Sequence, residues 1–138
     1  MSSATGKHLF VLIAEDDPFM QELLRDAFNA VDASVRLYIL PDGVKAIRYL
    51  DAAPQEELPD VILLDYSMPM LTGAEVLRKI HPDERYTSIP KVVLSTHNFA
   101  EIIDECMAAG ATRYFIKPFD PRALRHIVEE IIALTVVQ

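Results

Sequence analysis

Five short apolar runs recur along the chain, and turn-forming or charged residues bound each of them. An unbroken apolar run between turn signals predicts a strand that is buried on both faces, as in a parallel sheet. The second run alternates more between apolar and polar positions, so we expect it near an edge of the sheet. The predicted strands span residues 8–14, 34–40, 61–65, 91–96 and 113–117.

Apolar residues at helical spacing follow every predicted strand, and local signals mark where several of these helices begin. Asp17-Pro18 and Asp120-Pro121 each place an N-capping acid before a proline at the first helical position. Thr72 and Glu75 have the spacing of a capping box, in which each side chain satisfies a backbone N–H of the other residue. The sequence therefore predicts five helices, one after each strand.

The fourth helix is expected to begin at Asn98. Phe99 and Ile102 lie off its core-facing stripe, so we expect them to contact a partner. We expect a polar, mobile loop at 52–58 and an exposed loop at 81–89. The expected inner face of the fourth helix consists of Ile103, Cys106, Met107 and Gly110.

The strict alternation of strands and helices predicts a doubly wound parallel sheet of the α/β class, joined by right-handed crossovers. Sheets of this length commonly have the strand order 2-1-3-4-5, as in flavodoxin-like proteins, with a ligand crevice between strands 1 and 3. We expect residues 1–138 to form a single domain and residues 1–7 to be disordered.

The charge balance and the cysteine count exclude several classes of function. A net charge of −8 argues against nucleic acid as a direct ligand, because phosphate binding needs clustered Lys and Arg. The single cysteine, Cys106, rules out an internal disulfide and fits a reducing compartment. No stretch approaches the ~20 apolar residues of a membrane span. We therefore expect a cytoplasmic protein that binds neither nucleic acid nor membrane.

Polar side chains stand where the predicted strands end, and in a parallel sheet all of these ends lie at one edge. Closely packed carboxylates raise one another's pKa unless a cation lies among them. Oxygen ligands without His or Cys suit Mg²⁺, and a lysine at the same edge could meet a phosphoryl oxygen. The residues in question are Glu15, Asp16, Asp65, Ser95, Thr96 and Lys117.

Each of these residues, taken alone, has an ordinary structural explanation. Asp65 could simply form a turn, and Ser95 or Thr96 could bond the backbone at a strand end. Lys117 could be a surface lysine, and the neighbouring Asp17 is explained as an N-cap. Because the residues converge from four strand ends, we interpret them together as a functional site with Asp65 as the reactive residue.

Four segments of the sequence support a resemblance to a known family. They are EDD after the first strand, LLDYSMPMLTG around the third, PKVVLST at the fourth and YFIKPF at the fifth. In these segments, and over nearly its full length, the chain resembles the receiver domain of two-component response regulators. The resemblance implies that Asp65 accepts a phosphoryl group from a phosphohistidine. It further implies that Asp16 and Asp65 bind Mg²⁺ directly, Glu15 binds it through water and Ser67 binds it through its backbone carbonyl.

The same resemblance assigns the remaining roles. Ser95, five residues after Pro90, matches the switch hydroxyl, and the role moves to Thr96 if the register is off by one. Lys117 matches the lysine that contacts the phosphoryl group, and Tyr114 matches the aromatic switch residue. The family commonly has Thr where this chain has Ser95, and serine lacks the methyl group that restricts the rotamers of threonine.

We therefore expect a stand-alone phosphoacceptor switch in a two-component phosphorelay, and not a turnover enzyme. Its expected partners are a sensor histidine kinase or a histidine phosphotransfer protein, with a homodimer through helix 4, strand 5 and helix 5. An unphosphorylated pseudo-receiver that only binds other proteins is the alternative. A phosphatase of the haloacid dehalogenase type would need an acid where Ser67 stands, and Glu15-Asp16 would repel the phosphate of a flavin.

Overall fold

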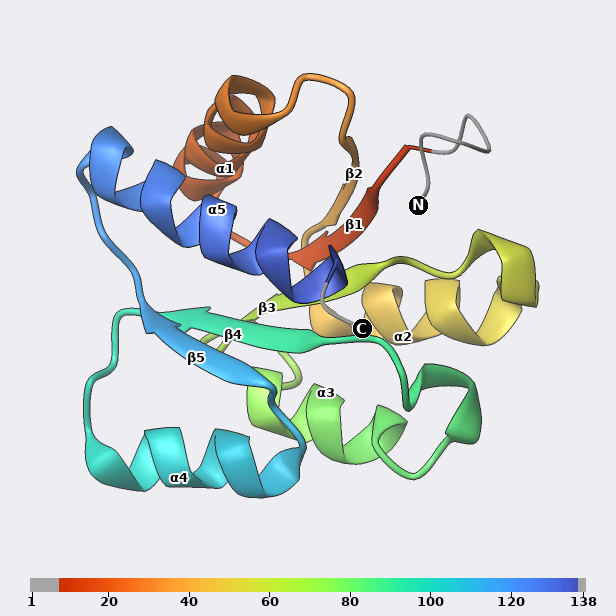
Figure 1. Cartoon of the computed structure of the whole chain (residues 1–138). Coiled ribbons are helices and arrows are strands. Elements are labelled where there is room, and N and C mark those ends of the chain that lie inside the picture. Colours follow the sequence, from red (N-terminus) through yellow and green to blue (C-terminus); the bar gives the residue numbers. More distant parts are fainter. Residues whose placement is uncertain (1–7, 137–138) are drawn as a thin grey trace.

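Five parallel strands form one sheet in the order β2-β1-β3-β4-β5, which confirms the predicted topology. The structure is a computed structural model, and it describes residues 8–136 (Figure 1). The prediction that residues 1–7 are disordered concerns positions outside this range. The strands are β1 (Phe10–Ala14), β2 (Arg36–Leu40), β3 (Val61–Asp65), β4 (Lys91–Ser95) and β5 (Arg113–Ile116). The helices are α1 (Pro18–Val31), α2 (Gly43–Ala52), α3 (Gly73–Ile80), α4 (Ala100–Ala109) and α5 (Pro121–Val136).

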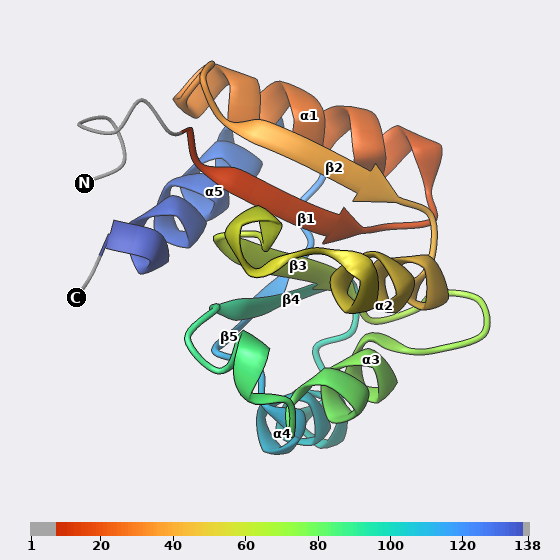
Figure 2. The same cartoon turned by 90° about the vertical axis from the view of Figure 1, so that its right-hand side faces the viewer.

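Helices cover both faces of the sheet, with α1 and α5 on one face and α2, α3 and α4 on the other (Figures 1 and 2). Alternate residues of each strand point to opposite faces, so each face has its own core. Val11 and Leu63 belong to the core under α1 and α5. Leu12 and Ile62 belong to the core on the other face. The three central strands are buried along their whole length, as their unbroken apolar runs predict.

Local signals place most helix starts where the sequence predicts them. The Asp17 side chain accepts a hydrogen bond from the backbone N–H of Phe19 at 3.0 Å, and proline follows Asp17. Thr72 and Glu75 form the predicted capping box at the start of α3. These caps depend only on neighbouring residues, which is why the sequence identifies them.

The predictions for α4 are partly wrong. Its N-cap is Phe99, not Asn98, and within residues 8–136 no side chain caps this end of the helix. The buried residues of α4 are Cys106 and Ala109, and Ile102 packs against the same core. Met107, expected inside, is 43% exposed. Apolar residues occur all around this helix, so a stripe rotated by one position fits the sequence equally well.

The expected exposed loop at 81–89 is also corrected. It contains a short 3₁₀ helix, Glu84–Tyr86, and the side chains of Tyr86 and Ile89 are buried. The loop at 52–58 likewise contains a short 3₁₀ helix, Gln55–Glu57, next to the buried Leu58. In both loops a few apolar residues, surrounded in sequence by polar ones, cover the end of the core. Their spacing follows neither a helical nor a strand period, so the sequence pattern does not reveal their burial.

Candidate functional site

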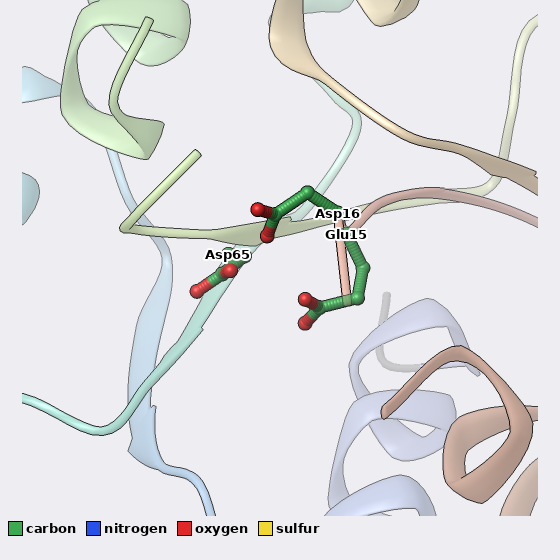
Figure 3. Close-up of side chains that lie close together, drawn as sticks. All are labelled: Glu15, Asp16 and Asp65. Carbon is green, nitrogen blue, oxygen red and sulfur yellow. The ribbon is translucent and has the colours of Figure 1, made fainter. Parts of the chain in front are cut away.

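Three carboxylates meet where β1 and β3 end. Oxygen atoms of Glu15, Asp16 and Asp65 all lie within 4.8 Å of one another (Figure 3). Glu15 and Asp65 are only 2% and 6% exposed, whereas Asp16 is open to solvent. A cluster of oxygens that is half buried and open on one side suits a hard divalent cation that keeps some of its water.

Backbone contacts fix the position of Glu15 at the end of β1. Its N–H donates to the carbonyl of Leu40 at 2.9 Å, which continues the pairing of β1 with β2. One of its side-chain oxygens accepts from the N–H of Asp17 at 3.0 Å. The side-chain amide of Gln21 donates to the Glu15 carbonyl at 2.7 Å. Sequence reasoning missed Gln21, because a glutamine on the first turns of a helix has many ordinary roles.

Gly73 allows the loop after β3 to fold back against the strand end. A Cβ atom at this position would lie 2.7 Å from the backbone oxygen of Asp65, closer than real Cβ atoms approach. The N–H of Gly73 donates to the carbonyl of Tyr66 at 2.9 Å and closes the loop. Met70, within this loop, has a positive φ of 74°. The glycine therefore places the start of α3 directly beside the reactive strand end.

Lys117 supplies a positive charge to the cluster. Its Nζ lies 2.9 Å from Oε1 of Glu15 and 3.3 Å from Oδ1 of Asp65, and its side chain is 8% exposed. Burial alone would lower the pKa of Lys117, but its bonds with Glu15 and Asp65 raise the pKa overall. Lys117 is therefore a permanent cation between two buried acids.

The surroundings of Asp65 disfavour its negative charge. Burial first, and then the charge of Glu15, raise the pKa of Asp65 to about 7, although Lys117 acts in the opposite direction. Three carboxylates and one ammonium leave an excess of negative charge at this edge of the sheet. A divalent cation among the oxygens would relieve that excess, and the residues present fit Mg²⁺.

The predicted switch residues lie together near the end of β4. Ser95 is fully buried, whereas Thr96 is exposed. The Ser95 Oγ accepts a hydrogen bond from the N–H of His97 at 3.1 Å. The hydroxyl of Tyr114 donates to the carbonyl of His97 at 2.6 Å. The structure thus brings Ser95 and Tyr114 to the same short loop, the one that leads into α4.

Two side-chain interactions beside Asp65 were not anticipated from the sequence. The Oγ of Ser67 lies 3.0 Å from Nε2 of His97. The hydroxyl of Tyr66 donates to Oε1 of Glu105 in α4 at 2.8 Å. This bond, with burial, raises the pKa of Tyr66 to about 12. Arg78 in α3 also contacts Glu105, at 3.3 Å.

The fold agrees with a comparison against protein families. Residues 11–129 match the response regulator receiver domain. The chain belongs to this family. The resemblance noted in the four strand-end segments is thereby confirmed.

Individual relatives agree with this assignment. A sensor histidine kinase, TmoS of Ectopseudomonas mendocina, is 29% identical over 126 residues, which are 91% of this chain and 12% of the kinase. The two-component response regulator ARR5 of Arabidopsis thaliana is 32% identical over 129 residues, which are 85% of this chain and 67% of the regulator. The chain therefore spans a small part of one relative and about two thirds of the other.

Solved structures of response regulators have the same fold. The phosphorylated cyanobacterial phytochrome response regulator RcpA superposes with a TM-score of 0.81 at 29% identity, covering 90% of this chain and 91% of RcpA. The Mn²⁺-bound form of response regulator Rcp1 superposes with a TM-score of 0.80 at 27% identity, covering 94% of this chain and 97% of Rcp1. Those two proteins were thus crystallised in a phosphorylated and in a metal-bound state.

Proposed function

We propose that this protein is a phosphoacceptor switch of a two-component phosphorelay, with residues 1–138 forming a single receiver domain. Asp65 accepts the phosphoryl group in the presence of Mg²⁺. The observation that carries the proposal is the position of Asp65: it ends β3 within 4.8 Å of Glu15 and Asp16, and 3.3 Å from Nζ of Lys117. The metal-bound and phosphorylated relatives support it.

The oxygen cluster of Glu15, Asp16 and Asp65 supports the metal-binding residues that the family resemblance implies. Asp16 and Asp65 would hold Mg²⁺ directly, Glu15 would hold it through water, and Ser67 would contribute its backbone carbonyl. When bound, the ion supplies positive charge that offsets the negative charge of the phosphoryl oxygens. The exposed position of Asp16 leaves a path for the ion from solvent.

The chemical step is a nucleophilic displacement at phosphorus by a carboxylate. An oxygen of Asp65 forms a bond to phosphorus as the bond to the donor's histidine nitrogen breaks, and the imidazole leaves with that electron pair. Lys117 then shifts its hydrogen bond from Asp65 to a phosphoryl oxygen while remaining close to Glu15. Catalysis here is mainly positioning and electrostatic stabilisation.

The conformational response passes through Ser95 and Tyr114. The Ser95 hydroxyl turns toward the new phosphoryl group and gives up the N–H of His97. The loop after β4 then moves together with the Tyr114 hydroxyl that it holds. The result is a shift between two packings of the face formed by α4, β5 and α5.

Receiver domains interact with histidine kinases or phosphotransfer proteins, and we propose one of these as the donor. A homodimer through the α4–β5–α5 face is the second proposed partner, supported by Ile116 of β5 and Met107 of α4, which are each 43% exposed. No helix within residues 8–136 has both the length and the apolar character to cross a membrane. We further propose that the protein is cytoplasmic and that neither nucleic acid nor membrane is a partner. We also propose that it does not turn over a substrate.

The test is incubation with acetyl phosphate and Mg²⁺, followed by intact-protein mass spectrometry. The wild type should gain one phosphoryl group, and Asp65→Asn should gain none. The control, Asp51→Asn, removes an exposed carboxylate on α2 and should behave as the wild type. Equal phosphorylation of Asp65→Asn and wild type would contradict the assignment. If the wild type neither binds Mg²⁺ nor is phosphorylated, the pseudo-receiver alternative holds.

A further inference from the structure

Local interactions fix the start of α4 less firmly than the start of its neighbour α3. The start of α3 has a complete capping box, in which Thr72 and Glu75 satisfy each other's backbone N–H groups at 2.8 and 3.1 Å. At the start of α4 the N-cap is Phe99, which is 61% exposed, and none of the side chains described caps it. Only Cys106 and Ala109 of this helix are fully buried. Other contacts must therefore hold α4 in place.

One such contact joins the middle of α4 to the residue directly after Asp65. The Tyr66 hydroxyl donates to Oε1 of Glu105 at 2.8 Å across 39 positions of sequence. The other oxygen of Glu105 accepts from both terminal nitrogens of Arg78, at 3.3 and 3.4 Å. Glu105 thus ties α4 both to α3 and to the end of β3. A hydrogen bond to a charged acceptor is among the stronger ones available to a side chain.

A second contact joins the segment before α4 to the next residue, Ser67. The Ser67 Oγ lies 3.0 Å from Nε2 of His97, 30 positions further along the chain. The His97 ring also meets the edge of the Tyr66 ring, with centroids 5.6 Å apart, and it lies 6.4 Å from the Phe99 ring. His97 is therefore held by both residues that follow Asp65.

We propose that Tyr66 and Ser67 are positioning residues for α4. Tyr66 tethers the middle of the helix through Glu105, and Ser67 tethers its start through His97. A displacement at the end of β3 then reaches α4 through Tyr66 and Glu105, along a route that does not pass through Ser95 and Tyr114. The contact of Ser67 with His97 converges on the loop that Ser95 and Tyr114 also hold. The two tethers replace the missing cap of α4, so the register of this helix depends on the reactive strand end. The role of the tethers in signalling rests on the proposed function; their role in holding α4 does not.

The test measures amide hydrogen exchange of the peptide that spans α4. Tyr66→Phe removes one hydroxyl and keeps the ring against His97. The matched control is Tyr49→Phe, because the Tyr49 hydroxyl also makes one hydrogen bond outside its own helix, to the carbonyl of Glu57 at 3.0 Å, on the α2 side of the molecule. Each protein is measured alone and with Mg²⁺ plus beryllofluoride, a phosphoryl analogue. The extent of phosphorylation by acetyl phosphate is recorded in parallel.

Without beryllofluoride, Tyr66→Phe should raise exchange in α4 by about fivefold and leave the central strands unchanged, since one charged-acceptor bond is lost. With beryllofluoride, the change in α4 exchange should be smaller in Tyr66→Phe than in the wild type. Tyr49→Phe should match the wild type in α4. Glu105→Gln keeps an acceptor for the Tyr66 hydroxyl and should resemble the wild type more closely than Glu105→Ala does.

Unchanged α4 exchange in Tyr66→Phe would overturn the proposal. So would a rise spread over the whole chain, because it would indicate general destabilisation. If α4 exchange in the wild type does not respond to beryllofluoride, the proposed function is contradicted instead. The measurement without beryllofluoride then still tests whether Tyr66 holds α4 in place.

Discussion

Two buried lysines at opposite ends of the sheet show how differently one residue type is used in this protein. Lys117 follows β5 at the carboxyl edge, and its Nζ lies between carboxylates of Glu15 and Asp65. Lys91 begins β4 at the amino edge and is 5% exposed. Its Nζ donates to the backbone carbonyls of Tyr86 and Ile89 at 2.5 and 3.0 Å. One lysine balances charge, and the other satisfies carbonyls at the end of a loop.

The pKa values follow the partners. Burial lowers the pKa of Lys91, because carbonyl oxygens only partly replace the water that the ammonium has lost. At Lys117 burial acts in the same direction, yet the acidic partners raise the pKa overall. The carboxyl edge therefore holds an excess of negative charge that a metal ion can offset, whereas the Lys91 ammonium at the amino edge already has carbonyl partners. The first edge is built for a ligand and the second for stability.

Removing each ammonium in turn separates the two roles of lysine. Lys117→Met should slow phosphorylation by acetyl phosphate by about 100-fold, because a charge aimed at the phosphoryl oxygens is lost. Lys91→Met should keep the rate within about twofold of the wild type, since it lies far from the transferred group. Rates of formation of the phosphorylated form, measured on folded protein, check both. Similar losses in the two variants would show that the edges are not functionally distinct.

The converse prediction concerns stability. Lys91→Met should lower the free energy of unfolding by about 2 kcal/mol, because two buried carbonyls lose a charged donor. Urea unfolding measures this loss. Lys45→Met, at an exposed position of α2, is the control and should stay close to the wild type. If Lys91→Met and Lys45→Met have the same free energy of unfolding, Lys91 does not have the structural role assigned to it.

The pH dependence sharpens the same contrast. The pKa of Asp65 lies at about 7 in the folded state, above its ordinary value of 3.8. The folded state therefore binds more protons between these values, and the stability contributed by this group falls as the pH rises toward and through 7. In metal-free buffer at pH 8, Asp65→Asn should be more stable than the wild type by about 1 kcal/mol, and the difference should shrink toward pH 4.

Thermal unfolding in the presence of a chelator measures this difference. Added Mg²⁺ should stabilise the wild type at pH 8, because the ion offsets the charge of the Asp65 carboxylate. Asp65→Asn lacks this carboxylate and should remain almost unchanged. A difference between the two proteins that does not vary with pH would refute the charge argument.

The smallest expected effect comes from Tyr86 at the amino edge. Its hydroxyl is buried without a hydrogen-bond partner among residues 8–136. Tyr86→Phe should therefore raise the free energy of unfolding by about 0.5 kcal/mol, because an unsatisfied polar group no longer loses its water on folding. Tyr114→Phe is the matched comparison, and it should lower stability by about 1 kcal/mol because the bond to His97 is lost. Chemical unfolding of both variants and the wild type in one buffer shows whether the two free energies of unfolding change in opposite directions.

The sequence predicts the strands to within two residues, because their signal is local. An apolar run bounded by turn residues shows both the strand and its end, as in Val61–Asp65. The same logic fails for α4, where apolar residues surround the helix and Asn98 competes with Phe99 as a cap. The buried Lys91 and Tyr86 were also missed, because nothing near them in sequence shows that they close the core.

The candidate site divides in the same way. The order of residues along the chain shows which polar residues end the strands, and the parallel topology then requires Glu15, Asp65 and Lys117 to meet at one edge. Their pairings, the extent to which the pKa of Asp65 is raised, and the bonds of Tyr66 and Ser67 to the α4 region depend on how the chain folds. Those bonds join residues 30 and 39 positions apart, and no local pattern encodes such a distance. Chemistry that depends on residue type is visible in the chain, whereas chemistry that depends on proximity arises only when the chain folds.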